Sequence, residues 1–195
     1  MSESITTRAA RAIMNGRYIG GLQDVPVPFS RAELYCAYRG GFFLFHVPAG
    51  SLGSYPGHLH AVLEERDFLY ERDAFRNEAL TQAEFVLAPP RLHVGSGGCT
   101  LDEQKREVHS HSILSPYEIV TMYSLFHGMY PGKALFLGQA RTEYEVGAFR
   151  THLHTEPLTT ILSSTVPGHI KLGKGYVTQI SPELGVMTGE RRLVV

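Results

Sequence analysis

The chain has 195 residues, of which 43% are hydrophobic and 19% are charged, and its formal net charge is −1. This length suits one domain with a sizeable core, and a near-neutral chain without runs of lysine or arginine is not expected to bind mainly nucleic acid or an anionic membrane. No apolar run approaches the roughly 20 residues that span a bilayer, and the first residues lack a signal-peptide core. We therefore expect a cytoplasmic protein without a membrane span.

The N-terminal half predicts a short helix followed by several buried strands. The helix is expected over residues 6–14 with a stop near Gly16, and a glycine- and proline-containing connector follows it. Charged residues interspersed with apolar ones indicate a solvent-facing helix over residues 66–80. Short apolar runs predict strands at residues 42–47, 58–63, 84–88 and 91–94.

The clearest helix signal is the segment Ser115-Pro116-Tyr117-Glu118. It forms a capping box, with serine as the N-cap, proline at the first helical position and glutamate three residues after the cap. This helix should stop at Gly128. The apolar run 134–138 is typical of a strand buried on both faces, and we expect it adjacent or nearly adjacent to strand 42–47, with the helix packed across both.

The C-terminal part changes from helical to β-type patterns. Helical periodicity continues over residues 149–162, whereas residues 169–180 and 185–195 have the pattern of hairpins. Together the elements predict a single three-layer-like α/β domain with a buried mixed or parallel sheet and a C-terminal β-hairpin extension. In this scheme residues 1–40 are an N-terminal extension, residues 41–165 the α/β core and residues 166–195 the hairpin tail.

The ten histidines are the residues most suited to chemistry, because neutral imidazole is the commonest metal ligand. On an extended chain, His58 and His60 would point to the same face, as would His109 and His111. With His46, these four are the predicted ligands of a divalent metal, nickel or zinc. The alternative for any one pair is that its histidines are ordinary surface or packing residues. The glycine-rich loop at 95–98 lacks a P-loop lysine, so no nucleotide is expected.

The order of several landmarks resembles that of the nickel–iron hydrogenase maturation endopeptidases. In that family a buried strand ends in a metal ligand, a Pro-Gly loop follows, and a histidine ligand precedes a helix. A Gly-X-X-Pro turn then leads to an apolar strand and a Glu-X-Gly stretch. In this chain the similarity covers about 110 residues, and its landmarks are the strand ending at Val47, Pro56-Gly57, His109 to Gly128, Pro131, Leu135 to Gly138 and Glu145 to Gly147.

The resemblance implies a metal-dependent endopeptidase, or an inactive relative, that acts on or binds a partner protein such as a hydrogenase large subunit. The chain departs from the family at two ligands. The glycine-rich strand-turn with its glutamate has no counterpart before Phe42, and His46 stands where the strand-end acidic ligand is expected. The catalytic residues are therefore left unassigned.

Two other functions fit the sequence. The chain could be a non-catalytic interaction or assembly subunit of a larger complex whose histidines are incidental. It could also be an unrelated histidine-ligated metalloenzyme, because His58-X-His60 with Glu64 resembles the first metal motif of the cupins. Metal analysis separates these hypotheses.

Overall fold

A computed structural model describes residues 5–21, 24–51, 62–65, 79–96, 101–108, 112–130, 138–145, 159–164, 169–175 and 184–194. Within these residues the chain forms two five-stranded sheets, two short strand pairs and four helices. Helices and a mixed parallel and antiparallel sheet pack together, so the α/β class predicted from the sequence is confirmed.

The central sheet has the strand order β2-β4-β8-β14-β9 and joins strands from both ends of the chain. β2 and β4 are parallel, whereas the other neighbouring strands are antiparallel. The apolar runs 42–47 and 84–88 are confirmed as strands, and they pair with each other. The five strands are β2 (Tyr18–Ile19), β4 (Phe43–Val47), β8 (Glu84–Ala88), β14 (Thr188–Leu193) and β9 (Ser112–Ile113).

The remaining strands form the second sheet, of order β13-β10-β11-β12-β6, and two small ladders. The second sheet contains β6 (Val62–Glu65), β10 (Gly138–Glu145), β11 (Thr159–Ser164), β12 (His169–Gly175) and β13 (Leu184–Val186). The small ladders pair β1 (Ile5–Thr6) with β3 (Pro26–Val27), and β5 (Gly50–Ser51) with β7 (Ala79–Leu80).

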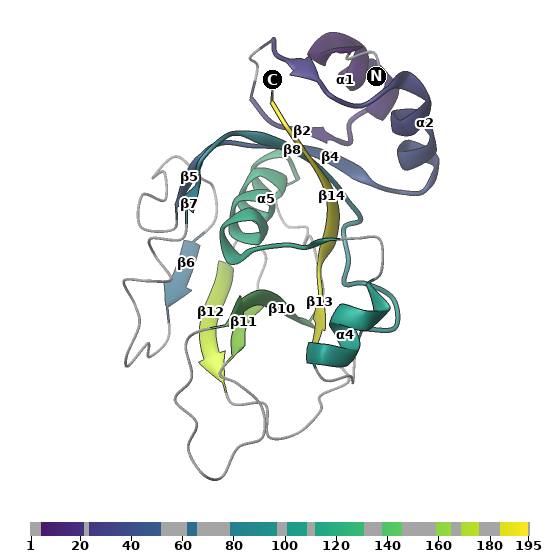
Figure 1. Cartoon of the computed structure of the whole chain (residues 1–195). Coiled ribbons are helices and arrows are strands. Elements are labelled where there is room, and N and C mark those ends of the chain that lie inside the picture. Colours follow the sequence, from purple (N-terminus) through teal and green to yellow (C-terminus); the bar gives the residue numbers. More distant parts are fainter. Residues whose placement is uncertain are drawn as a thin grey trace.

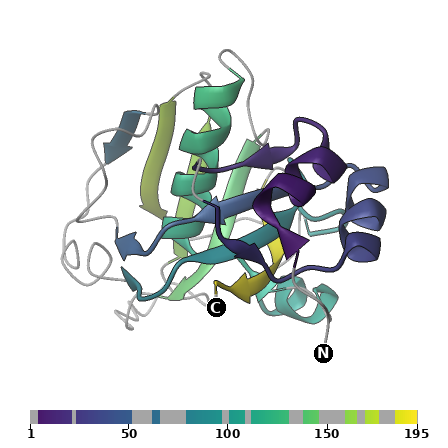
Figure 2. The same ribbon diagram turned by 90° about the horizontal axis from the view of Figure 1, so that it is seen from above.

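Helices cover both faces of the central sheet, as Figure 1 shows. α1 (Thr7–Met14) and α2 (Arg31–Arg39) lie on one face, and α5 (Pro116–Met129) lies on the other, where it packs against β2 and β4. Successive side chains of β4 alternate between the layers, so Leu44 joins the core under α1 and α2 while Phe45 joins the core under α5. In Figure 2, α5 crosses the direction of β4 and β8. The remaining helix is α4 (Leu101–Glu107).

Side-chain caps define where the helices begin. Thr6 caps α1, and Asn15 ends it in the left-handed conformation just before Gly16, so the predicted short helix is confirmed. The predicted capping box of Ser115 is also present at the start of α5. That helix continues through Gly128 to Met129, one residue beyond the predicted stop.

Three predicted elements differ in the structure. Residues 91–94 form no strand; they follow two prolines, which cannot donate to a ladder, and the His93 N–H donates instead to the Val186 carbonyl at 2.7 Å. Residues 159–162 lie in β11, not in a helix, because β10 and β12 pair with them on both sides. Residues 79–80, expected at the end of a helix, form β7.

The prediction that residues 134–138 form a strand adjacent or nearly adjacent to β4 falls mostly outside the described residues. Residues 134–137 lie outside the described residues, and the strand that begins at Gly138 is β10, in the second sheet. β4 pairs on one side with β2 and on the other with β8, so no edge is left for β10. The predicted packing of the 116–129 helix across β4 is confirmed.

The C-terminal tail forms strands, but not a separate hairpin extension. β14 lies between β8 and β9 inside the central sheet, and β12 pairs with β11 and β6. Similarly, the N-terminal residues contribute β2 to the central sheet as well as the α1 and α2 layer. None of the described helices has the length and apolar character needed to cross a bilayer.

Candidate functional site

Two consecutive arginines of β14 fasten the helical layers to opposite faces of the central sheet. Neighbouring residues of a strand point to opposite faces, so Arg191 reaches towards α5 and Arg192 towards α2. Each binds the glutamate at the third position of a capped helix, Glu118 in α5 and Glu33 in α2. Each face of the sheet therefore carries one arginine–glutamate pair that holds a helix, and we call these two pairs clamps. The exposure and the neighbours of the two carboxylates differ, and these differences indicate which pair has a further role.

The clamp on the α5 side has a buried carboxylate. Arg191 binds both oxygens of Glu118: Nε donates to Oε1, and Nη2 donates to Oε2 at 2.8 Å. Nη2 also donates to the carbonyl of Ile113 at 2.6 Å. The Ser115 N–H donates to Glu118 Oε2 at 2.6 Å, and only 3% of the Glu118 side chain is exposed. This fork-shaped pair, whose carboxylate is buried, holds the start of α5 against β14.

The clamp on the α2 side has the same parts but is open to solvent. Arg192 Nη2 donates to Glu33 Oε1 at 2.6 Å, and the guanidinium carbon lies 4.3 Å from the centre of the Phe29 ring. The Glu33 side chain is 39% exposed. Hydrogen bonds from Arg192 and Ser30 lower the pKa of Glu33 to about 2. Because the Glu33 side chain is exposed, the pair is an ordinary surface ion pair.

A second buried carboxyl distinguishes the α5 side. Glu84 opens β8, and its side chain is 5% exposed. Its Oε1 lies 3.9 Å from Nε of Arg191 and has no hydrogen-bond partner among the described residues. Two buried glutamates thus share one arginine, an arrangement in which ionising both carboxyls is unfavourable.

The two carboxyls have opposite pKa shifts. Burial, the hydrogen bond to Glu118 and the charge of Glu118 raise the pKa of Glu84 to about 8, against the opposing charge of Arg191. Burial also works to raise the pKa of Glu118, but the hydrogen bond and charge of Arg191 outweigh it, so that pKa is lowered. At neutral pH, Glu84 is therefore the protonated partner and donates its proton in the hydrogen bond to the Glu118 carboxylate. Pairs of groups with pKa values pushed apart are typical of acid–base sites.

The carboxyl pair lines a cavity of about 200 Å³. Its wall includes the exposed Ala79 and also Tyr117, whose hydroxyl donates to the carbonyl of Pro48 at 3.1 Å. A side chain at Gly50 would place its Cβ 2.5 Å from that hydroxyl, so the wall depends on glycine there. The lining residues are Ala79, Leu80, Glu84, Ser115, Tyr117, Glu118 and Arg191.

Of the predicted metal ligands, the structure describes His46. His46 is half-buried in β4 and faces the α1 and α2 layer, where its ring stacks on Phe85 with centroids 4.9 Å apart. Burial lowers its pKa. His58, His60, His109 and His111 lie outside the described residues, among which no group of three or more potential metal-binding side chains occurs.

The metal site remains a prediction that concerns His46 and the two His-X-His pairs.

The sequence did not identify the carboxyl pair as a site. Glu118 was recognised as part of the capping box, and Glu84 only as the first residue of a strand. A charged residue that begins an otherwise apolar run is only a weak sign of a functional site. Glu84 and Arg191 lie 107 positions apart and meet only because β8 pairs with β14. The helix α2 was also missed, although Ser30 and Glu33 have capping-box spacing.

Comparison with known proteins finds no matching family model, no similar curated protein and no similar solved structure. The function is therefore inferred from the chemistry of the site.

Proposed function

We propose that the chain is an enzyme that uses Glu84 as a general acid on a small oxygen-containing substrate, such as an ester or a carbonyl compound. The observation that carries this proposal is a buried, protonated Glu84 that lines a cavity and has one carboxyl oxygen, Oε1, without a hydrogen-bond partner among the described residues. A volume of about 200 Å³ corresponds to roughly six or seven molecules of liquid water, so the substrate, or the part of it that enters, is small.

The surrounding groups suit proton donation. Glu118, kept ionised by Arg191, raises the pKa of Glu84 and so keeps the proton on Glu84 at neutral pH. In the reaction a substrate oxygen replaces Glu118 as the acceptor of the Glu84 proton. For an ester, water adds to the carbonyl carbon and loses a proton to solvent; as the bond from that carbon to the alkoxide oxygen breaks, the O–H bond of Glu84 breaks and a new O–H bond forms on the departing oxygen. The carboxylate left behind lies 3.9 Å from Arg191, which stabilises it until solvent returns a proton.

The test compares the parent with Glu84→Gln and, as a matched control, Glu33→Gln on the opposite face of the sheet. Two probe reactions cover the proposed substrates: hydrolysis of para-nitrophenyl acetate, and solvent deuterium exchange into pyruvate followed by proton NMR. We expect catalysis of at least one reaction, a loss of about 10²-fold or more in Glu84→Gln, and no loss in Glu33→Gln. The rate should fall above about pH 8, as Glu84 loses its proton.

A second measurement applies if neither probe reacts. Carbon-13 NMR of labelled glutamate carboxyls should show one resonance that titrates near pH 8 and is absent in Glu84→Gln. Unchanged catalysis in Glu84→Gln, or a parent protein in which no glutamate titrates above pH 6, would remove the basis of the proposal.

The second candidate is the metal-dependent function implied by the maturation-peptidase resemblance, with a partner protein as its target. It is favoured by two landmarks: a buried strand that ends at Val47, and a capped helix that begins at Pro116, shortly after His109 and His111. The proposed ligands are His46 and the histidine pairs 58/60 and 109/111. Stoichiometric nickel or zinc in protein purified without a tag would support this function, and its absence after metal supplementation would count against it.

A further inference from the structure

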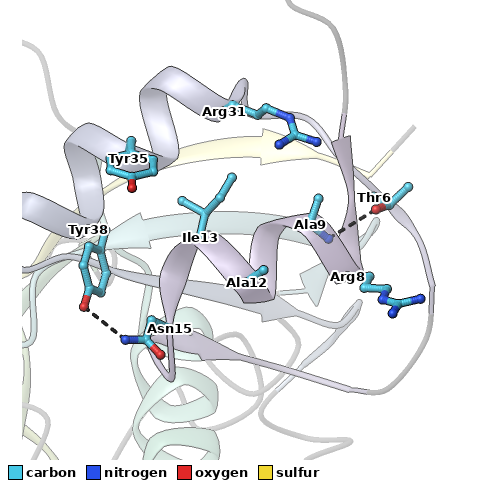
Figure 3. A pocket seen from close by; sticks show the side chains of 9 residues that line it. All are labelled: Thr6, Arg8, Ala9, Ala12, Ile13, Asn15, Arg31, Tyr35 and Tyr38. Atoms are coloured by element: carbon cyan, nitrogen blue, oxygen red, sulfur yellow. Dashed lines mark hydrogen bonds between the residues drawn. The ribbon is translucent and has the colours of Figure 1, made fainter.

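The outer surface of the N-terminal helical layer carries a groove of about 630 Å³ between α1 and α2. Figure 3 shows its shape: Arg8 and Arg31 lie at one end, Tyr35 and Tyr38 lie at the other, and Ile13 lies between them. The groove belongs to the face of the molecule opposite α5 and the carboxyl pair. The lining residues are Thr6, Arg8, Ala9, Ala12, Ile13, Asn15, Arg31, Tyr35 and Tyr38.

The charge around the groove is positive, in contrast to the chain as a whole. Residues 5–40 contain five arginines and two acidic residues, whereas the whole chain has a formal net charge of −1. One of the two acidic residues, Glu33, is already bound to Arg192. The groove therefore lies in a local field that attracts negatively charged groups.

The arginines of this layer divide into two kinds. Arg11 donates to the carbonyl of Gly21, and Arg17 donates to that of Tyr38 at 2.6 Å, so both serve the fold. Arg8 and Arg31 are exposed, and neither forms a hydrogen bond or ion pair with any residue that the structure describes. Their guanidinium groups are available as forked donors for a carboxylate.

The other end of the groove offers apolar and aromatic surface. Tyr35 is 61% exposed, one of the largest exposed hydrophobic side chains among the described residues. Tyr38 is half-buried, and its hydroxyl accepts a hydrogen bond from Asn15 at 3.4 Å, which fixes that end of the groove. Exposed tyrosines and arginines are the residues that most often supply binding energy at protein interfaces.

We propose that this groove binds an extended peptide segment of a partner protein that carries an acidic residue and, about three residues away, an aromatic or large apolar residue. The spacing follows from α2: Arg31 and Tyr38 are seven positions apart, about 10 Å along a helix, and an extended peptide covers that distance in about three residues. The apolar lining of Ala9, Ala12 and Ile13 favours a peptide, and two arginines are fewer than the phosphate contacts that a nucleic-acid site normally makes.

The test uses fluorescence anisotropy with a fluorescein-labelled peptide in which two aspartates are followed, after two serines, by a phenylalanine. One matched peptide has asparagines in place of the aspartates, and another has glycine in place of the phenylalanine. The proteins are the parent, the double variant Arg8→Gln/Arg31→Gln, Tyr35→Ser, and the control Arg39→Gln, which removes an exposed arginine of α2 outside the groove.

We expect the double variant to weaken binding of the aspartate peptide at least fivefold, to the level of the asparagine peptide. Tyr35→Ser should weaken only the peptides that contain phenylalanine, and Arg39→Gln should change binding less than twofold. Binding should also weaken as salt rises from 50 to 200 mM. Equal thermal unfolding temperatures will show that the exposed substitutions leave the fold intact.

Three outcomes would overturn the proposal. The first is no binding by the parent at millimolar protein, and the second is equal binding by the parent and the double variant. The third is binding of a short single-stranded DNA that is tighter than binding of the aspartate peptide and that depends on Arg8 and Arg31. That result would assign the groove to nucleic acid. Glu84→Gln should leave peptide binding unchanged, so the groove and the acid site succeed or fail independently.

Discussion

Replacing Glu84 by glutamine should make the stability of the protein less dependent on pH. Glutamine has the shape of a protonated glutamate and retains a donor for the Glu118 carboxylate, but it cannot ionise. The folded-state pKa of Glu84 is raised from 4.5 to about 8, so the folded protein holds this proton more tightly than the unfolded chain. The stabilisation from the protonated form is complete below about pH 4.5 and is lost as the pH rises to about 8.

The size of the effect follows from the same shift. At about 1.4 kcal/mol for each pKa unit, ionising buried Glu84 costs at most about 5 kcal/mol. Water entering the cavity and the nearby Arg191 should reduce this, and we expect roughly 2–4 kcal/mol. Glu84→Gln should therefore be more stable than the parent by that amount at pH 8.5, and by much less at pH 4.5.

Urea unfolding followed by circular dichroism at pH 4.5, 6, 7 and 8.5 measures this difference directly. Glu33→Gln is the control: the pKa of Glu33 is lowered to about 2, so its stabilising contribution is complete above pH 4.5 and is lost only in stronger acid. Its stability difference from the parent should be constant over the measured range. A Glu84→Gln difference that is equally flat would refute the assignment of a raised pKa to Glu84.

Three further outcomes are expected. Glu118→Gln should cost roughly 1–3 kcal/mol, because Arg191 loses its two hydrogen bonds to a buried carboxylate while Glu84 supplies only part of the lost charge. Glu33→Gln should cost about 0–1 kcal/mol. Chemical unfolding at pH 7 distinguishes the two variants, and equal costs would contradict the contrast between the buried and the exposed carboxylate. Ser115→Ala should lower the stability by about 0.5–2 kcal/mol, because the Glu118 N–H loses its acceptor, and thermal unfolding measures this loss. His111→Ala should lower the stability less; an equal loss would mark His111 as a packing residue and not a site residue. Replacing His109 and His111 together by alanine should abolish nickel or zinc binding in calorimetry, and unchanged binding would exclude this pair as ligands.

The local elements could be predicted because their signals lie within a few residues. The capping box at Ser115 specifies the start of α5, and Thr6 and Asn15 bound α1 in the same way. The continuous apolar run at residues 42–47 indicated a strand covered on both faces, and helical layers cover both faces of β4. The run at residues 84–88 indicated a short strand, which is β8. The helix α2 was not predicted, although Ser30 and Glu33 have the spacing of a capping box.

Strand partners could not be predicted, because pairing depends on residues far apart in the chain. Nothing near residue 188 indicates that the C-terminal segment enters the central sheet between β8 and β9. The hairpin expected there closes a shorter loop and so costs less chain entropy. The same applies to residues 159–162, whose apolar spacing suits a helix until β10 and β12 provide ladders on both sides.

The sequence by itself determined the caps, the apolar strands and the overall α/β class, since these follow from side-chain sterics and hydrogen bonding over a few residues. Only the tertiary structure decided the chemistry around Glu84. The pairing of β14 with β8 brings Arg191 beside Glu84, and the packing of α5 adds Glu118. A carboxyl keeps its ordinary pKa in water, and only enclosure beside a second, arginine-bound carboxylate keeps it protonated at neutral pH.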